Sequence, residues 1–161
     1  MKKRTVSMMG IESPTGSHLS VLEEAARAAT GLIIEHGAGI YSTPLLSRVG
    51  AHVLCIEPHP GWAEWSRWMY QGTAEVVPSW KQAASHIEIA SLVFIDGPAA
   101  ERGVLVQACL DRGVPVIIAH DTNENDWAMY GYQPHMFIHA GYLVTHHAED
   151  THRTTRWVRR S

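Results

Sequence analysis

Short apolar runs alternate with longer segments of helical periodicity along most of the chain. The apolar runs are rich in β-branched side chains and are nearly continuous, which is typical of parallel strands covered on both faces. They predict strands at residues 31–35, 51–57, 74–77, 91–96 and 114–120.

The segments between these runs predict helices at residues 19–29, 43–49, 61–71 and 99–112. Ser17 is a candidate N-cap of the first helix, and Gly113 follows the last one as a C-cap glycine does. Strand and helix alternate, and such connections are right-handed. The pattern therefore predicts an α/β fold with a doubly wound, mostly parallel sheet.

The last part of the chain has a different pattern. Two short β-like runs, 141–147 and 154–160, flank the turn-like residues 148–153. This arrangement predicts an antiparallel hairpin at the edge of the sheet. We expect one domain over residues 1–161, with residues 1–16 as a candidate flexible or cofactor-covering arm.

Composition narrows the class of protein. The chain has 161 residues, 45% of them hydrophobic and 18% charged, which excludes a disordered tail and a coiled coil. Its net charge of −3 provides no overall basic field for nucleic acid. No apolar run is long enough to span a bilayer or to form a secretory signal. Cys55 and Cys109 lie in apolar segments, as buried free thiols do, so we expect a cytoplasmic protein.

The loop after the first predicted strand is the most informative segment. Glu35 ends the strand, and Gly37 and Gly39 form a G-x-G turn before a helix with Pro44 in its first turn. Glycine lets a backbone turn sharply and approach a ligand, and a helix N-terminus offers free N–H groups. Glu57 ends the second strand about twenty residues after the first glycine, where an acid accepts ribose hydroxyls.

Two cofactors suit this arrangement, a dinucleotide such as NAD and S-adenosylmethionine. The charge of Glu35 opposes a pyrophosphate but suits a cationic amino-acid ligand. Ser42 stands where the dinucleotide motif has its third glycine. Both observations favour S-adenosylmethionine over NAD.

Four motifs, EHGAGIYST, CIEP, FIDGP and IAHDTN, occur in that order between Glu35 and Asn123. In them the chain resembles the class I S-adenosylmethionine-dependent methyltransferases, whose Rossmann-like sheet ends in an antiparallel hairpin. The chain departs from the family at Tyr41, where glycine is common, and in its short third strand. The resemblance implies that Glu35, Gly37 and Gly39 hold the methionine end and that Glu57 holds the ribose. We place Ser42 and Asp96 at the same cofactor site.

Acidic residues also follow the fourth and fifth predicted strands. Asp96 ends one, and His120 and Asp121 end the next, so these side chains are expected to meet at the carboxyl edge of the sheet, where ligands bind. We predict Asp96, His120 and Asp121 as catalytic residues that orient or deprotonate the methyl acceptor. The structural alternative is that Asp96 heads a turn and that Asp121 caps the next helix.

This cluster also resembles the magnesium site of the metal-dependent catechol-type O-methyltransferases. There, an Asp after strand four and an Asp-Asn pair after strand five hold the ion. The resemblance implies Asp96, Asp121 and Asn123 as magnesium ligands, although Thr122 interrupts the pair. Carboxylates suit magnesium, while histidine admits manganese, iron or zinc.

Aromatic and basic residues allow further interpretations. Trp62, Trp65 and Met69 have helical spacing and predict a face packed on the sheet. Four arginines lie among the last nine residues. Such a basic segment admits a phosphate-bearing or nucleic-acid acceptor, but it is more typical of a protected edge strand. The arginines are Arg153, Arg156, Arg159 and Arg160.

The expected function is methyl transfer from S-adenosylmethionine to an oxygen or nitrogen of a small-molecule acceptor. We expect no membrane partner and no nucleic acid, and a homo-oligomer is an open alternative because a second subunit can complete a shallow pocket. The alternative functions are a non-catalytic module that binds a nucleoside or a partner protein, and an NAD-type Rossmann protein.

Overall fold

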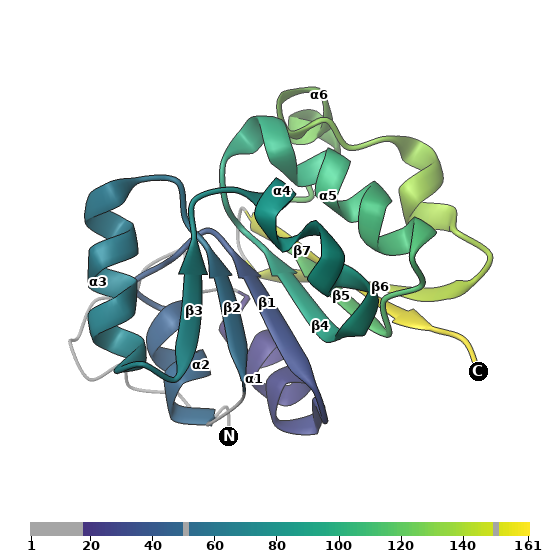
Figure 1. The fold of residues 1–161 in the computed structure, drawn as a ribbon. Coiled ribbons are helices and arrows are strands. Elements are labelled where there is room, and N and C mark those ends of the chain that lie inside the picture. The colour runs from purple at the N-terminus through teal and green to yellow at the C-terminus, as the bar shows by residue number, and fades with distance from the viewer. Residues whose placement is uncertain (1–17, 50–51, 150–151) are drawn as a thin grey trace, which may run out of the picture.

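In the computed structural model, a 7-stranded sheet has the order β3-β2-β1-β4-β5-β7-β6 (Figure 1). The structure describes residues 18–49, 52–149 and 152–161. The predicted arm at residues 1–16 and the predicted cap Ser17 therefore lie outside the described residues. The strands are β1 (Leu32–His36), β2 (Val53–Ile56), β3 (Ala74–Val77), β4 (Ala90–Ile95), β5 (Val116–Ala119), β6 (Tyr142–Glu149) and β7 (His152–Arg159).

The pairing of the strands confirms the predicted fold class. Strands β1 to β5 pair in parallel, β7 pairs antiparallel with β5, and β6 pairs antiparallel with β7. The carboxyl ends of β1, β2, β4 and β5 consequently share one edge of the sheet (Figure 1).

Helices cover both faces of the sheet (Figure 1). Neighbouring strand residues face opposite ways, so Ile33 packs in one hydrophobic cluster with α1 and α2, and Ile34 packs in the other with α5. Gly113 has φ +70 after α5, and its N–H bonds to Leu110 O at 3.1 Å, as predicted for a C-cap glycine. The helices are α1 (Leu19–Ala28), α2 (Ser42–Val49), α3 (Pro60–Tyr70), α4 (Trp80–Ala83), η2 (Ala84–Ile89), α5 (Ala99–Asp111), η3 (Glu124–Asp126), α6 (Trp127–Tyr130) and η4 (Pro134–Ile138).

The prediction for the terminal turn was wrong in its extent. Residues 148–153 were expected to form it, but Ala148 pairs with Arg153 and Glu149 pairs with His152. Charged residues are typical of turns, yet they also continue a ladder in which their backbone groups are hydrogen-bonded.

The predicted packing face of α3 was also wrong. Trp62 is 40% exposed and both Trp65 and Met69 are only half-buried, whereas Ala63, Ser66 and Tyr70 form the buried face. The polar groups of that face have internal partners, because Ser66 Oγ donates to Trp62 O at 2.8 Å and the Tyr70 hydroxyl donates to a Glu35 oxygen. Satisfied polar groups are readily buried, so side-chain hydrophobicity alone selected the wrong stripe.

None of the helices in the described ranges combines the length and the apolarity that crossing a membrane requires.

Candidate active site

The glycine loop after β1 is held tightly between two strands. Gly37 has φ +90, and its N–H donates to Ile56 O at 2.9 Å. A Cβ at Gly37 would lie 2.4 Å from Gly97 Cα, so this position requires glycine both for its conformation and for close approach. The loop after β1 therefore touches the loop after β4. At Gly39 the N–H donates to Thr43 Oγ1 at 3.1 Å, which joins the loop to α2.

Glu35 lies below this loop with 0% of its surface exposed. Thr43 Oγ1 donates to Glu35 Oε1 at 2.9 Å, and the Tyr70 hydroxyl donates to Oε2 at 2.7 Å. Ser42, the first residue of α2, also hydrogen-bonds this carboxyl group, while burial raises its pKa. The carboxyl group of Glu35 thus faces the interior and supports the loop, and its contact with the methionine end of a cofactor stays a prediction.

Glu57 connects the end of β2 to the glycine loop. Its Oε2 accepts the N–H of Ala38 at 2.9 Å, and its Oε1 accepts the N–H of His59 at 2.7 Å. A carboxylate has about four lone-pair sites, so these two bonds leave acceptor capacity for hydroxyl groups. Contact between Glu57 and a ribose stays a prediction.

The structure brings Asp96, His120 and Asp121 together at the ends of β4 and β5, as expected. His120 Nδ1 lies 3.3 Å from Asp96 Oδ1 and 3.5 Å from Asp121 Oδ1. Asp121 has φ +53, a left-handed conformation that aspartate tolerates better than most residues. It does not cap the next helix, since η3 begins after Asn123.

Arg102 is a member of this cluster that sequence reasoning missed. It is buried on α5 and lies 3.0 Å from both Asp96 Oδ1 and Asp121 Oδ2. Its Nε also donates to Gly97 O at 2.7 Å, and its guanidinium carbon is 4.4 Å from the centre of the Tyr130 ring. The sequence does contain a sign of this role. Arg102 precedes the buried Val106 by about one turn, so a charged residue lies on the apolar face of α5.

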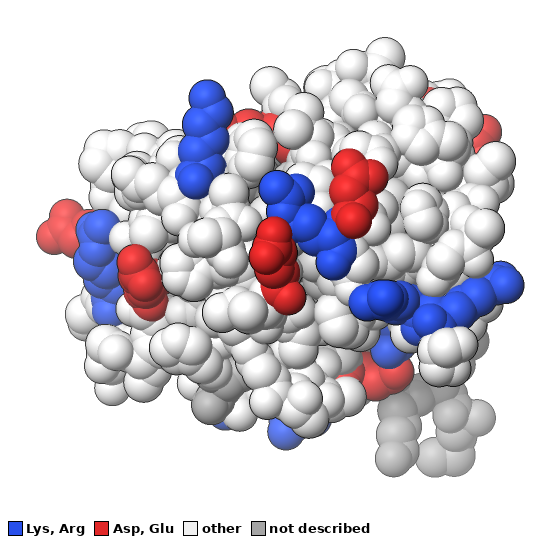
Figure 2. Space-filling view, turned by 45° about the vertical axis from the view of Figure 1, so that its right-hand side comes forward, with Lys and Arg blue, Asp and Glu red and all other residues white. Residues whose placement is uncertain are grey.

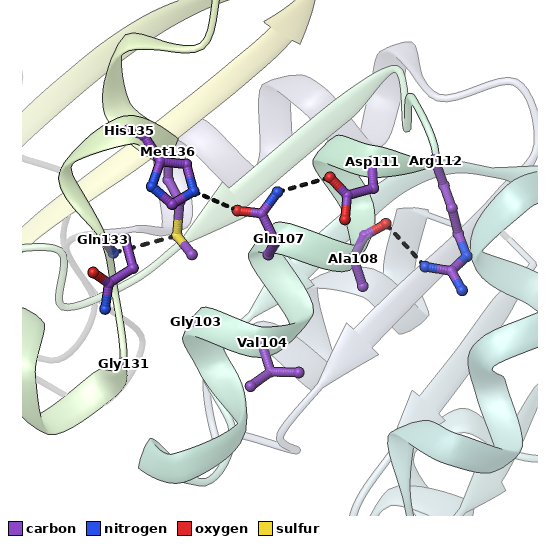
Figure 3. A pocket seen from close by; sticks show the side chains of 10 residues that line it. All are labelled: Gly103, Val104, Gln107, Ala108, Asp111, Arg112, Gly131, Gln133, His135 and Met136. Atoms are coloured by element: carbon purple, nitrogen blue, oxygen red, sulfur yellow. Dashed lines mark hydrogen bonds between the residues drawn. The ribbon is translucent and has the colours of Figure 1, made fainter.

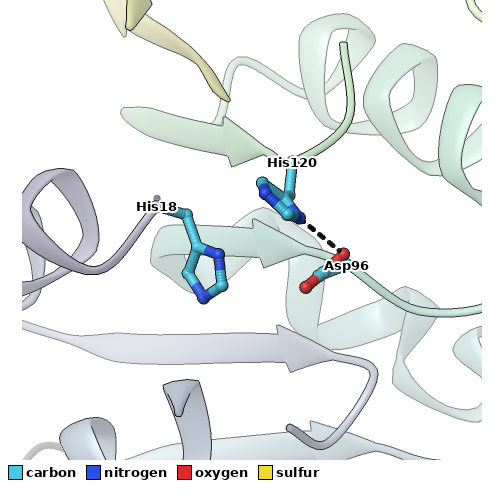
Figure 4. Close-up of side chains that lie close together, drawn as sticks. All are labelled: His18, Asp96 and His120. Carbon is cyan, nitrogen blue, oxygen red and sulfur yellow. Dashed lines mark hydrogen bonds and ion pairs between the residues drawn. The ribbon is translucent and has the colours of Figure 1, made fainter. Parts of the chain in front are cut away.

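Two further histidines, His152 and His18, complete the cluster. His152 Nδ1 is 2.8 Å from Asp121 Oδ1. The ring centre of His18 is 4.7 Å from that of His120, and burial lowers the pKa of His18 to about 4 (Figure 4). No local pattern marks His18, because its neighbours come from distant strands.

Electrostatics keep Asp121 ionised. Its burial opposes ionisation, but His120, the hydrogen bond from His152 and the charge of Arg102 together hold its pKa below the usual range. At neutral pH the cluster therefore holds a carboxylate beside a permanent cation and imidazoles.

The predicted magnesium ligands do not fit that ion in this arrangement. Asp96 and Asp121 already share the guanidinium of Arg102, and the side-chain amide of Asn123 donates to Asp126 Oδ2 at 3.2 Å. The cation that neutralises the two carboxylates is an arginine, so we derive no step through magnesium.

A groove of about 430 Å³ lies elsewhere, between α5 and residues 131–136 (Figure 3). Its polar side chains bond to one another, with Gln107 2.7 Å from both His135 and Asp111. It contains none of the predicted site residues.

Comparison with known proteins places the fold. No protein-family model matches the chain, and no curated protein matches it in sequence. An O-methyltransferase from Bacillus cereus, solved with S-adenosylhomocysteine, aligns with a TM-score of 0.67 and 17% identity over 96% of this chain and 84% of that one. The fold is that of the class I methyltransferases.

Two further solved methyltransferases are similar to this chain in fold. The O-methyltransferase of Streptomyces achromogenes involved in tomaymycin synthesis, solved with S-adenosylmethionine, has a TM-score of 0.67 and 16% identity over 93% of this chain and 82% of that one. An RNA methyltransferase from Salinibacter ruber, solved with S-adenosylhomocysteine, has a TM-score of 0.58 and 15% identity over 92% of both chains.

The class I methyltransferase topology also separates this chain from NAD-type sheets. Those sheets have the parallel order 3-2-1-4-5-6, whereas here the antiparallel β7 lies between β5 and β6. The NAD-type alternative is therefore not favoured.

Proposed function

We propose that this protein transfers a methyl group from S-adenosylmethionine to an oxygen or nitrogen of a small-molecule acceptor. One observation carries the proposal: Gly37 of the predicted cofactor loop packs against Gly97, which directly follows Asp96. A cofactor on that loop is consequently adjacent to the Asp96 and His120 pair. Solved neighbours of the same fold contain S-adenosylmethionine or S-adenosylhomocysteine, which supports this choice of cofactor.

The proposed cofactor site divides the predicted residues into two groups. Gly37 and Gly39 shape the loop that receives the methionine end, and Glu57 accepts the ribose hydroxyls. Glu35 and Ser42 hold this loop from the interior through their mutual hydrogen bond. Asp96 lies where the cofactor and acceptor regions meet.

The chemistry requires mainly position. The acceptor atom attacks the methyl carbon in line as the bond between that carbon and sulfur breaks, and orientation supplies most of the acceleration. His120 takes the proton of the acceptor, and Asp96 and Asp121, whose oxygens lie 3.3 and 3.5 Å from His120 Nδ1, stabilise the imidazolium that forms. Arg102 positions both carboxylates.

A nucleic-acid acceptor is the second candidate, because one solved neighbour is an RNA methyltransferase. The terminal arginines do not favour it. Arg156 pairs with Glu24 at 2.8 Å, Arg159 donates to Gly113 O at 3.1 Å, and Arg153 donates to Thr122 O at 2.9 Å. The face in Figure 2 is largely uncharged, with red side chains beside several of the blue ones. We therefore propose a small molecule.

Calorimetric titration with S-adenosylmethionine tests the cofactor. We expect one site, and Glu57→Gln is expected to weaken binding at least about tenfold because a neutral amide is a weaker acceptor than a carboxylate. Glu64→Gln, on the exposed side of α3, is the matched control and retains the wild-type affinity. No binding to the wild type contradicts the proposal.

Formation of S-adenosylhomocysteine with pooled phenols, catechols and amines tests catalysis. His120→Gln is expected to lower turnover by about 10²–10⁴-fold, as loss of a general base does, with cofactor affinity retained. The control is His135→Gln, in the groove beside α5. Equal turnover in both variants removes His120 from the mechanism, and activity only with RNA favours the second candidate.

A further inference from the structure

His18 carries a buried imidazole that the proposed methyl transfer does not use. Only 2% of its surface is exposed, and neither ring nitrogen has a hydrogen-bond partner within the described part of the chain. Buried side-chain nitrogens are nearly always hydrogen-bonded, so this exception requires an explanation.

Helix capping does not explain His18. The residue occupies the N-cap position of α1, but its side chain makes no capping hydrogen bond. Histidine is not among the preferred N-cap residues, whose short side chains reach the free N–H groups of the first turn. The ring points instead toward the ends of β4 and β5 (Figure 4).

His18 faces two other metal-binding side chains there. One ligand atom each from His18, Asp96 and His120 lie within 4.8 Å of one another. Asp96 uses Oδ1 for its contacts with His120 and Arg102, and its other oxygen lies on the side of His18 (Figure 4). The Asp96 side chain is 24% exposed, which opens the cluster to solvent.

We propose that His18, Asp96 and His120 form a binding site for a divalent transition-metal ion of the zinc, cobalt and manganese class. Two imidazoles and one carboxylate are a donor set that such ions accept while leaving coordination positions open. Metal–ligand bonds of about 2.1 Å place neighbouring donors about 3–3.5 Å apart, so the side chains need to move inward only slightly. The ion gives the imidazole of His18 a partner, and while the ion is bound His120 serves as a ligand and not as the base of the proposed methyl transfer.

This donor set differs from the magnesium set implied by the sequence. Magnesium prefers oxygen ligands, whereas two of the three donors here are nitrogens. Arg102 keeps its contacts with Asp96 Oδ1 and Asp121, because the proposed ion uses the opposite side of the Asp96 carboxylate.

A second trio, His120, Asp121 and His152, has similar spacing but is less suited to an ion. His152 Nδ1 already contacts Asp121 Oδ1 at 2.8 Å, and Asp121 Oδ2 accepts hydrogen bonds from Arg102 and Tyr130. Its donors are thus engaged with one another, whereas neither ring nitrogen of His18 has a hydrogen-bond partner among the residues that the structure describes.

Zinc titration of the untagged, metal-free protein tests the site. With a chromophoric chelator as competitor, we expect one zinc per chain, and His18→Gln is expected to weaken its binding by about a hundredfold or more. His52→Gln, an exposed histidine, is the matched control and keeps the wild-type affinity. Absence of stoichiometric zinc, or equal affinity in the His18 and His52 variants, overturns the proposal.

Cobalt provides a readout that does not depend on activity. The wild type with one equivalent of Co²⁺ is expected to show visible absorption bands of nitrogen-ligated cobalt, while millimolar Mg²⁺ leaves the bands unchanged. Asp96→Asn abolishes the bands and His152→Gln retains them. Bands lost in His152→Gln but kept in His18→Gln place the ion in the second trio and overturn the assignment.

Folding and function are separated by two further measurements. Circular dichroism establishes whether each variant is folded. If His18→Gln does not fold, the variant His18→Gly is tested instead with added imidazole, because glycine is tolerated at an N-cap. Rescue of zinc binding by imidazole is the expected result, and its absence in a folded variant contradicts the site. Zinc is titrated without S-adenosylmethionine or acceptor, so this proposal and the proposed methyl transfer can each fail alone.

Discussion

The carboxyl ends of β1 and β2 and those of β4 and β5 lie at one edge of the sheet, but their carboxyl groups have different partners. Glu35 and Glu57 are bonded to hydroxyls and backbone N–H groups, which are neutral donors. Asp96 and Asp121 are bonded to a guanidinium and to imidazoles. The first region thus fixes the shape of a loop, while the second keeps ionised groups beside groups that exchange protons.

The difference between these two groups of carboxylates is tested most strongly at Arg102. Arg102→Met leaves Asp96 and Asp121 without their buried cation, and we expect the free energy of unfolding to fall by about 3–5 kcal/mol in urea titrations. The control Arg112→Met removes a half-exposed arginine 3.9 Å from Glu88 and is expected to cost less than about 1 kcal/mol. Equal losses in the two variants indicate that the strand-end cluster does not depend on Arg102.

The glycine loop is tested by Gly37→Ala. We expect a loss of about 2–4 kcal/mol, because the new Cβ combines an unfavourable positive φ with overlap against Gly97. Gly72→Ala is the matched control, since Gly72 has φ +81 but open space around it, and its cost is about 1–2 kcal/mol. Urea unfolding measures both, and similar losses contradict the close packing of the two loops.

The neutral environment of Glu35 has a consequence for pH dependence. Burial raises its pKa above 4.5, so the folded state binds the proton more tightly than the unfolded state does. Its contribution to stability is fully present below pH 4.5 and is lost as the pH rises through the folded-state pKa, by at most about 1.4 kcal/mol per pH unit. Urea titrations across this range measure it. Glu35→Gln is expected to remove this dependence, and an unchanged slope refutes the interpretation.

The smallest expected effect concerns Tyr130. Its hydroxyl donates to Asp121 Oδ2 at 3.3 Å, and its ring lies under Arg102. Tyr130→Phe removes only the neutral hydrogen bond, so the expected loss in unfolding free energy is about 0.5–1 kcal/mol. A loss as large as that of Arg102→Met would show that the hydroxyl, rather than the guanidinium, holds Asp121.

Much of the fold followed from local pattern. Continuous apolar runs located the parallel strands, and the strand-end acids Asp96 and Asp121 were placed correctly because parallel strands share a carboxyl edge. Helix α3 shows the limit of this reasoning. Its Trp stripe and its Ala63, Ser66 and Tyr70 stripe have the same spacing, and only the partner of Tyr70 on β1 decides which one is buried.

By itself the sequence determined where strands, helices and the glycine turn occur, because backbone sterics and the periodicity of apolar residues act between near neighbours. Only the tertiary structure decided what each polar group contacts. Glu35 became internal, Arg102 became the cation between two aspartates, and His18 came to lie beside His120. These contacts join segments that are distant in the chain, and the packing of helices on the sheet determines which of them meet.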